Sequence, residues 1–365
     1  MLLTACALAA LGTTPAAAGH GKLSWYEGTF EAAKAEAART DKIIFIDFWA
    51  DWCGWCKKLD KDTFSDDAVA ERMADFLCLS IDTESEAGAP IAEEFAAQSL
   101  PTLLFLDPDG SVRDVIKGYL PPEPFLEEVG RIQRNEGTVP ALRKQVEENP
   151  TSIEARFELA QKLQSVGDAK GYDAQMAAIA ELDPEGKSLP MRRLAFYEAL
   201  EPLRRELETA PLLAFLEQEQ THDELIFDGW QWIARAEDYH RRQKEDADEM
   251  EAAAQHAAKA YDALHTAWSR VPKDRVDSGG NAVAWMIFEM REHLDAPQMA
   301  FALGVAKEAV AASEEKNTAI LDTLAWLQFA TGDKEGAIAT IKKAIALEPE
   351  SEDWQATLSK FTTEM

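Results

Sequence analysis

The first third of the chain alternates short apolar runs with amphipathic segments. Ile43-Ile44-Phe45-Ile46 is a nearly continuous apolar run, which is typical of a strand buried on both faces. Later apolar runs are separated by segments whose apolar residues recur at helical spacing. This order predicts an α/β domain. The predicted strands are 42–49, 75–82, 102–106 and 111–117. One helix is predicted within 25–40, and others over 57–73, 91–98 and 122–134.

The pattern changes near residue 137. Gly137-Thr138-Val139-Pro140 interrupts the periodicity, and no segment of 141–365 has the character of a strand. This region is rich in Ala, Leu and Glu, which predicts an all-α domain. We therefore predict a signal peptide over 1–18, an α/β domain over 19–136 and a helical domain over 137–365.

The helical region contains repeats. In residues 318–349, small and apolar residues follow the spacing of a tetratricopeptide repeat, and the segment resembles that family. Residues 153–184 and 281–314 fit the same spacing less well. The resemblance implies stacked helix pairs whose concave face binds a protein or peptide ligand. Five tryptophans are expected either to line that face or to pack between helices: Trp230, Trp232, Trp268, Trp285 and Trp326.

The N-terminal segment predicts export. It is rich in Leu and Ala and ends in Ala16-Ala17-Ala18, the pattern of a signal-peptide cleavage site. In a competing interpretation, Leu3-Thr4-Ala5-Cys6 resembles a lipoprotein box, which would anchor the protein to a membrane through Cys6. A third interpretation is that the segment is neither. Both export interpretations place the protein in the bacterial envelope, in the periplasm or at a membrane, where disulfide chemistry is used.

The net charge of −29 restricts the partners. Nucleic-acid binding needs a basic surface, and anionic lipid repels an acidic one, so we expect neither as a partner. The acidity is interpreted as a solvated surface, or alternatively as a surface for a basic protein.

The main chemical signal is Cys53-Gly54-Trp55-Cys56, between the first predicted strand and a predicted helix. Cys53 would lie at the helix N-terminus, where unpaired N–H groups stabilise an anion. The anion here is the thiolate, which is the attacking form of cysteine. Cys56 lies about one helical turn further on and can close a disulfide with Cys53. The motif therefore predicts a redox disulfide in which one cysteine attacks and the other resolves.

The surrounding sequence resembles the active site of the thioredoxin superfamily. Residues 47–57 (Asp-Phe-Trp-Ala-Asp-Trp-Cys-Gly-Trp-Cys-Lys) carry the resemblance, 99–102 (Ser-Leu-Pro-Thr) are similar to its cis-proline loop, and Gly118 matches a glycine after its last strand. Thr-Phe-Ser-Asp-Asp at 63–67 is similar to the C-terminal reductase domain of bacterial transmembrane thiol:disulfide interchange proteins. The resemblance covers residues 24–134 and implies a thioredoxin-like fold, a central mixed sheet with flanking helices.

The resemblance also implies a role for Asp47. A matching aspartate in thioredoxins lies buried behind the disulfide, so we expect Asp47 to be the acid/base partner of Cys56, with a pKa raised by burial. The alternative is an aspartate at the strand end that faces water. Thioredoxins carry a lysine near this carboxylate, whereas the matching residue here is Cys78. Cys78 is interpreted as a small core residue, or alternatively as a third redox sulfur.

Further residues are expected to contact a substrate. By the resemblance, Leu100 and Pro101 precede a strand and offer backbone groups to an incoming peptide, across a cis bond. Trp52, Gly54 and Trp55 surround or separate the cysteines and are also expected to bind substrate.

Two functions remain open. The first is an envelope thiol:disulfide oxidoreductase that reduces protein disulfides, with a membrane protein as electron donor and helical repeats that recruit substrate or redox partner. The second is an interaction protein, whose thioredoxin-like domain is a docking module or a redox-set latch. Structural zinc needs four ligands, and the chain has no second cysteine pair, so we expect neither a metal nor a cofactor.

Overall fold

The computed structural model describes residues 21–363, and the chain divides into two compact units, Met1–Gly186 and Lys187–Met365. Each unit is described by itself. The signal-peptide and lipoprotein predictions, with Cys6, lie outside the described residues. Within those residues, none of the helices combines the length and the apolar character that crossing a membrane requires.

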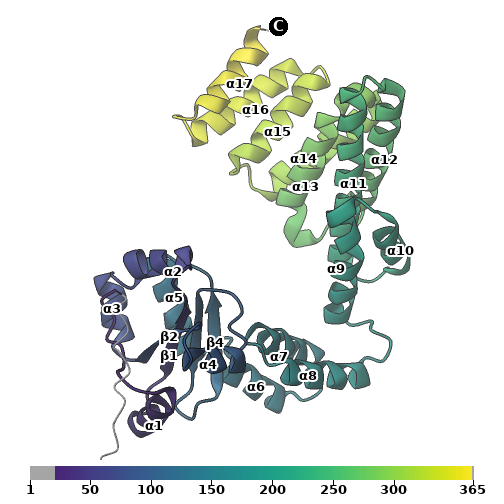
Figure 1. Cartoon of the computed structure of the whole chain (residues 1–365). Helices are drawn as coiled ribbons and strands as arrows, with labels where there is room; N and C mark the ends of the chain where they lie inside the picture. The colour runs from purple at the N-terminus through teal and green to yellow at the C-terminus, as the bar shows by residue number, and fades with distance from the viewer. Residues whose placement is uncertain (1–20, 364–365) are drawn as a thin grey trace, which may run out of the picture. The chain divides into compact units, whose positions relative to one another are not determined.

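A four-stranded mixed sheet forms the centre of the first unit (Figure 1). β1 (Ile44–Trp49) is parallel to β2 (Leu77–Asp82) and antiparallel to β3 (Thr102–Leu106). β4 (Val112–Lys117) pairs antiparallel with β3, so the strand order is β2-β1-β3-β4. Since β1 is central and covered on both faces, nearly all its residues are buried, which explains its continuous apolar run.

Helices cover both faces of this sheet. Phe45 and Phe105 face a core that includes residues of α3 and α5, and Ile46 and Leu104 face a core that includes residues of α1 and α4. This arrangement confirms the predicted α/β fold, a mixed sheet with flanking helices. The helices are α1 (Phe30–Thr40), α2 (Gly54–Lys58), α3 (Asp67–Met73), α4 (Gly88–Glu94) and α5 (Pro122–Gln133).

The single helix predicted over 57–73 is wrong. The chain instead forms α2, a π-helical turn (η1, Leu59–Thr63) and α3. Two contacts cause the break. Phe64 is fully buried beside the ring of Phe45, and the Asp66 carboxylate accepts the first amides of α3, which starts a new helix.

The helix predicted within residues 25–40 is α1, which begins at Phe30 because the Thr29 hydroxyl caps its first turn. One other helix differs from its predicted bounds. The helix predicted over 91–98 is α4, which ends at Glu94, and Ala96 then adopts a left-handed conformation with φ of 50°.

The helices α6 (Val139–Glu148), α7 (Ile153–Ser165) and α8 (Ala169–Leu182) belong to the first unit. The Asp114 carboxylate of β4 is fully buried and accepts hydrogen bonds from Lys162 Nζ of α7 and from the Arg131 guanidinium of α5, each at 2.9 Å. Apolar residues of β4 also pack against α6 and α7. The first compact unit therefore extends beyond residue 136, where the sequence analysis placed the end of the α/β domain. That domain boundary stays a prediction.

The second unit is helical throughout its described residues (Figure 1). Consecutive helices pack in pairs, α11 with α12, α13 with α14 and α15 with α16. The predicted all-α architecture is therefore confirmed. Its helices are α9 (Leu189–Glu206), α10 (Ala210–Gln218), α11 (Asp223–Asp246), α12 (Met250–Trp268), α13 (Val276–Glu289), α14 (Ala296–Ala312), α15 (Thr318–Ala330), α16 (Lys334–Leu347) and α17 (Glu352–Thr363).

Two predicted repeats coincide with helix pairs, since residues 153–184 form α7 and α8 and residues 318–349 form α15 and α16. The third, 281–314, begins inside α13 and ends just after α14. The first two pairs share one turn. Gly167 and Gly332 take φ of 85° and 90°, and the aspartate after each caps the next helix.

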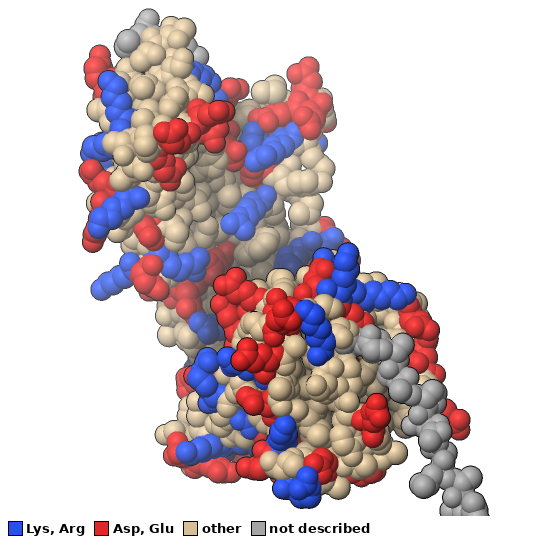
Figure 2. All heavy atoms as spheres, turned by 90° about the vertical axis from the view of Figure 1, so that its left-hand side faces the viewer, with Lys and Arg blue, Asp and Glu red and all other residues tan. Residues whose placement is uncertain are grey.

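The tryptophans mostly pack between helices. Trp230, Trp232, Trp268 and Trp326 are partly buried against the core of the second unit, whereas Trp285 is 36% exposed. Acidic and basic side chains are interspersed on the face drawn in Figure 2, as a solvated surface requires.

Replacing Asp114 tests the bond that joins α7 to the sheet. We expect Asp114→Ala to lower the free energy of unfolding by about 3 kcal/mol, because Arg131 and Lys162 lose a buried partner. Urea denaturation measures the change. Glu148→Ala is the control, since Glu148 forms an exposed pair with Lys144, and we expect a loss below about 0.5 kcal/mol. Equal losses of stability in Asp114→Ala and Glu148→Ala would contradict the role of Asp114 in joining α7 to the sheet.

The ion pair of Glu219 makes the stability of the second unit sensitive to acid. Although burial opposes ionisation, Arg192 at 2.6 Å and the amides of Thr221 and His222 lower the pKa of Glu219 to about 2. A carboxyl with a lowered folded-state pKa stabilises the fold above its unfolded pKa of about 4.5, and this contribution is lost as pH falls towards 2. We expect Glu219→Gln to cost about 2 kcal/mol at pH 7 and much less near pH 2. Denaturation at both pH values measures the difference in the free energy of unfolding between the wild type and Glu219→Gln. A difference that stays the same near pH 2 would contradict the role assigned to Glu219.

Candidate redox site

The two motif cysteines lie at the start of α2. Cys53 is the N-cap residue, with extended backbone dihedrals, and forms a disulfide with Cys56. The Cys56 amide donates a hydrogen bond to Cys53 Sγ at 3.1 Å. Both residues are nearly buried, at 3% and 4% exposure. The first sulfur therefore lies where the amide and the helix dipole favour a negative charge once the disulfide is reduced.

The proline loop lies at the same end of the sheet. The Leu100–Pro101 bond is cis, as the sequence predicted. Thr102, which follows it, pairs with Phe48 near the end of β1, the strand that leads into the cysteines. The Pro101 carbonyl accepts the Gly118 amide at 2.9 Å, whereas within residues 21–363 the Leu100 N–H and C=O make no hydrogen bond. Both Leu100 backbone groups therefore have no partner among the described residues.

Asp47 is buried, at 2% exposure, so the alternative of a strand-end aspartate facing water is excluded. Side chains alternate along a strand, and Phe45 faces the core that includes Leu59 of η1. Asp47 therefore points to the side of the sheet covered by the cysteine-bearing segment. Ser80 and Leu103 are its neighbours on the adjacent strands.

Cys78 has the character of a core residue. It pairs with Phe45 in the register of β1 and β2, and its side chain is 2% exposed. Burial disfavours the thiolate and raises the pKa of Cys78 to about 12. The thiol therefore stays protonated at physiological pH, which supports the core interpretation over a third redox sulfur.

Two tryptophans form an exposed rim beside the disulfide. Trp52 is 69% exposed and donates its indole N–H to Glu84 at 2.9 Å. Trp55 is 57% exposed, and its ring lies 5.8 Å from that of Tyr119. Gly54, between them in sequence, has open space where a Cβ would stand. All three residues are therefore accessible to a substrate chain.

Sequence reasoning missed Glu84 and Tyr119. The Tyr119 hydroxyl donates to Asp62, which also pairs with Lys58 of α2, so this network holds Tyr119 beside Trp55. No local pattern marks either residue. For Tyr119, the sequence offered only its position directly after Gly118. The contacts of Glu84 with Trp52 and of Tyr119 with Trp55 join segments that are far apart in the sequence.

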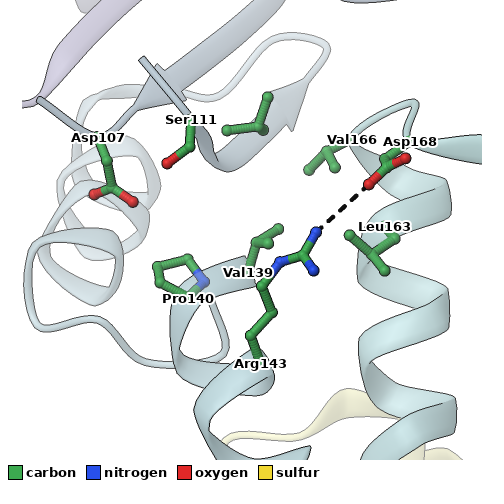
Figure 3. Close-up of a pocket in the computed structure, with 9 residues that line it drawn as sticks. Asp107, Ser111, Val139, Pro140, Arg143, Leu163, Val166 and Asp168 are labelled. Atoms are coloured by element: carbon green, nitrogen blue, oxygen red, sulfur yellow. Dashed lines mark ion pairs between the residues drawn. The ribbon is translucent and has the colours of Figure 1, made fainter. Parts of the chain in front are cut away.

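A separate cavity lies at the opposite end of the sheet (Figure 3). It encloses about 210 Å³, and its lining includes none of the predicted site residues. Val139 and Leu163 form part of an apolar wall, and Arg143 pairs with Asp168 at 3.6 Å across it. Among residues 21–363 we find no cluster of three or more His, Cys, Asp or Glu side chains suited to a metal ion.

Part of the first unit is similar to known proteins. Residues 30–133 match a family model described as a thioredoxin-like domain. The thiol:disulfide interchange protein DsbD of Vibrio vulnificus (strain CMCP6) is 37% identical over 102 residues, which cover 27% of this chain and 17% of that protein. The chain therefore spans about a sixth of the length of such curated relatives.

Two solved structures are similar to parts of this chain. The oxidised DsbD C-terminal domain of Neisseria meningitidis is 22% identical, covers 28% of this chain and 90% of that chain, and has a TM-score of 0.25. A thermophilic TPR protein of Thermus thermophilus is 16% identical and covers 66% of this chain and 95% of that chain, with a TM-score of 0.31. Residues 30–133 are thus a thioredoxin-like domain that resembles the DsbD C-terminal domain, followed by a largely helical region.

Thiol labelling tests the environments of the cysteines. After reduction at pH 8, we expect iodoacetamide to modify Cys53 in the folded protein much faster than Cys78, because the Cys56 amide favours the Cys53 thiolate whereas burial keeps the Cys78 thiol protonated. Peptide mass mapping identifies the sites. A sample unfolded in guanidinium is the control, in which Cys78 must react. Rapid labelling of Cys78 in the folded protein would overturn its assignment to the core.

Proposed function

We propose that this protein is a thiol:disulfide oxidoreductase of the bacterial envelope that reduces protein disulfides. The observation that carries the proposal is the Cys53–Cys56 pair at the start of α2, beside the cis-proline loop. The similarity of residues 30–133 to interchange proteins supports the same chemistry.

Cys53 is the attacking residue in this proposal. In the reduced protein its thiolate lies at the N-terminus of α2, where the Cys56 amide donates to it. The thiolate attacks one sulfur of a substrate disulfide and forms a mixed disulfide, and the other substrate sulfur leaves as a thiolate that takes up a proton. The exposed indoles of Trp52 and Trp55 flank the approach.

Cys56 completes the transfer. Its thiolate attacks Cys53 Sγ, so the Cys53–Cys56 disulfide forms and the second substrate sulfur leaves as a thiol. Two electrons have then passed from the protein to the substrate. Asp47 is the proposed acceptor of the Cys56 proton, since its carboxylate is buried on the side of the sheet covered by this segment.

The substrate chain is proposed to lie beside Leu100 as an added strand. The Leu100 N–H and C=O make no hydrogen bond within the described residues, and Pro101 holds them at the end of the sheet nearest the cysteines. Recognition would then depend on backbone atoms and on the aromatic rim, which suits protein disulfides of varied sequence.

The proposal also assigns roles to the N-terminal segment, to an electron donor and to the helical repeats. The leader exports the protein to the periplasm, or anchors it through Cys6. A membrane protein supplies electrons to the disulfide. The helical repeats recruit a protein substrate or redox partner, which is the usual use of stacked helix pairs.

Cysteine variants test the chemistry. We expect Cys53→Ser to abolish the acceleration of insulin reduction over the rate with dithiothreitol alone, because no attacking thiolate remains. Cys56→Ser should accumulate a mixed disulfide, visible on a non-reducing gel, since the resolving thiol is missing. The matched control is Cys78→Ser, which should keep most of the activity. Full activity of Cys53→Ser would refute the enzyme and favour the interaction protein.

The reduction potential tests the direction. Equilibration with glutathione or dithiothreitol buffers, read by thiol trapping, should give a value near about −270 mV, the value typical of a thioredoxin. A value near about −120 mV, typical of a strong periplasmic oxidant, would instead make the protein a disulfide donor.

A further inference from the structure

A polar cavity of about 350 Å³ lies in the second unit, between α11 and the start of α13. The small residues Ser278, Gly279 and Ala282 line one side of it. A Cβ on Gly279 would meet the Phe227 ring at 2.7 Å, so the two helices approach closely here. The remaining lining residues, all on α11 or just before α13, are Asp228, Gln231, Trp232, Arg235 and Arg275.

The two arginines that line this cavity differ in their ion pairing. Arg275 pairs with Asp228 at 2.8 Å and lies over the Phe227 ring, so its charge is already compensated. Hydrogen bonding to Asp228 raises the pKa of Arg275, and Asp274 and Glu224 add to the effect. Arg275 therefore has a structural role and stays charged.

Arg235 differs from Arg275. It is exposed, and within residues 21–363 no carboxylate pairs with it. Its guanidinium lies 5.1 Å from the Trp232 ring, which holds the group at the cavity wall. Arg275 is paired with Asp228, so among the described residues that line the cavity Arg235 is the cation without a carboxylate partner.

Gln231 is the second independent feature. It lines the cavity and is 7% exposed, yet its amide makes no hydrogen bond to any residue within 21–363. Neither amide atom of Gln231 is among the fully buried side-chain atoms without a partner in residues 21–363, so the amide is open to the cavity and a ligand there can reach it. Gln231 can donate to or accept from a polar group that lies beside Arg235.

We propose that this cavity binds the carboxylate of a small polar ligand or of a peptide C-terminus. The fork of Arg235 suits a carboxylate, and Gln231 and Ser278 supply neutral hydrogen-bonding groups beside it. Arg235 supplies a single unpaired cation, and Asp228, Asp274 and Glu224 make the surroundings of the cavity acidic, which favours a monoanion over a phosphate dianion. The Trp232 ring offers an apolar wall to the rest of the ligand. This site is independent of the cysteine chemistry.

Isothermal titration calorimetry of the full chain tests the site. The probes are N-acetylalanine, N-acetyl-trialanine, the C-terminal amide of that tripeptide, and inorganic phosphate. We expect both free carboxylates to bind and the amide and phosphate to bind at least about 10-fold more weakly, because they lack the matching charge. A tripeptide at least about 5-fold tighter than N-acetylalanine identifies a chain end as the ligand, and equal affinities identify a small acid; either result supports the carboxylate site.

Variants connect the binding to the cavity. Arg235→Gln and Gln231→Leu should each weaken binding of the better carboxylate, the first by at least about 10-fold. Lys244→Gln is the matched control, since this residue lies on α11 but pairs with Glu249 outside the cavity, and it should change nothing. Circular dichroism confirms the fold of each variant. Absence of carboxylate binding at 10 mM, equal binding of the amide, or unchanged affinity in Arg235→Gln would overturn the proposal.

Discussion

The hydrogen bond from the Cys56 amide to Cys53 Sγ is the interaction on which the redox site depends. It exists because a buried strand ends directly before a helix whose first turn contains both cysteines. The amide that would otherwise be an unsatisfied donor at the helix start instead stabilises charge on sulfur. The central position of β1 holds this turn in place, since helices cover both faces of the strand.

The chain after Cys56 is built to keep that turn short. α2 passes into a π-helical turn and stops, and buried Phe64 then anchors the chain in the core below. Asp62 lies in this π-helical turn, and it holds Tyr119, which in turn lies beside Trp55. The irregular segment therefore connects the core of the domain with the aromatic rim of the site.

A buried charge plays a comparable role away from the site. Asp114 brings together α5, α7 and β4, so that helices of the predicted repeat domain complete the first compact unit. The second unit instead places Arg235, which has no carboxylate partner within residues 21–363, and the accessible amide of Gln231 around one cavity. Redox chemistry and ligand binding would thus belong to separate units, which allows each to change without disturbing the other.

The sequence by itself determined the local features. The strand of β1, the cysteine pair at a helix start and the paired helices of 318–349 all follow from patterns within about 35 residues, whereas the cis proline before β3 was implied by the resemblance to the thioredoxin superfamily. Such patterns are set by local periodicity and turn chemistry, which neighbouring residues carry. Their agreement with the structure explains why the fold class could be predicted, whereas helix bounds were less accurate.

Only the tertiary structure decided which distant residues meet. The break after Thr63 depends on packing of Phe64 against another strand, and the rim contacts of Glu84 and Tyr119 depend on the register of the sheet. The pairing of Asp114 with Lys162 and the cavity at Arg235 arise from helix packing. These contacts join segments far apart in the chain, and a hydrophobic pattern specifies that a face is buried without specifying what covers it.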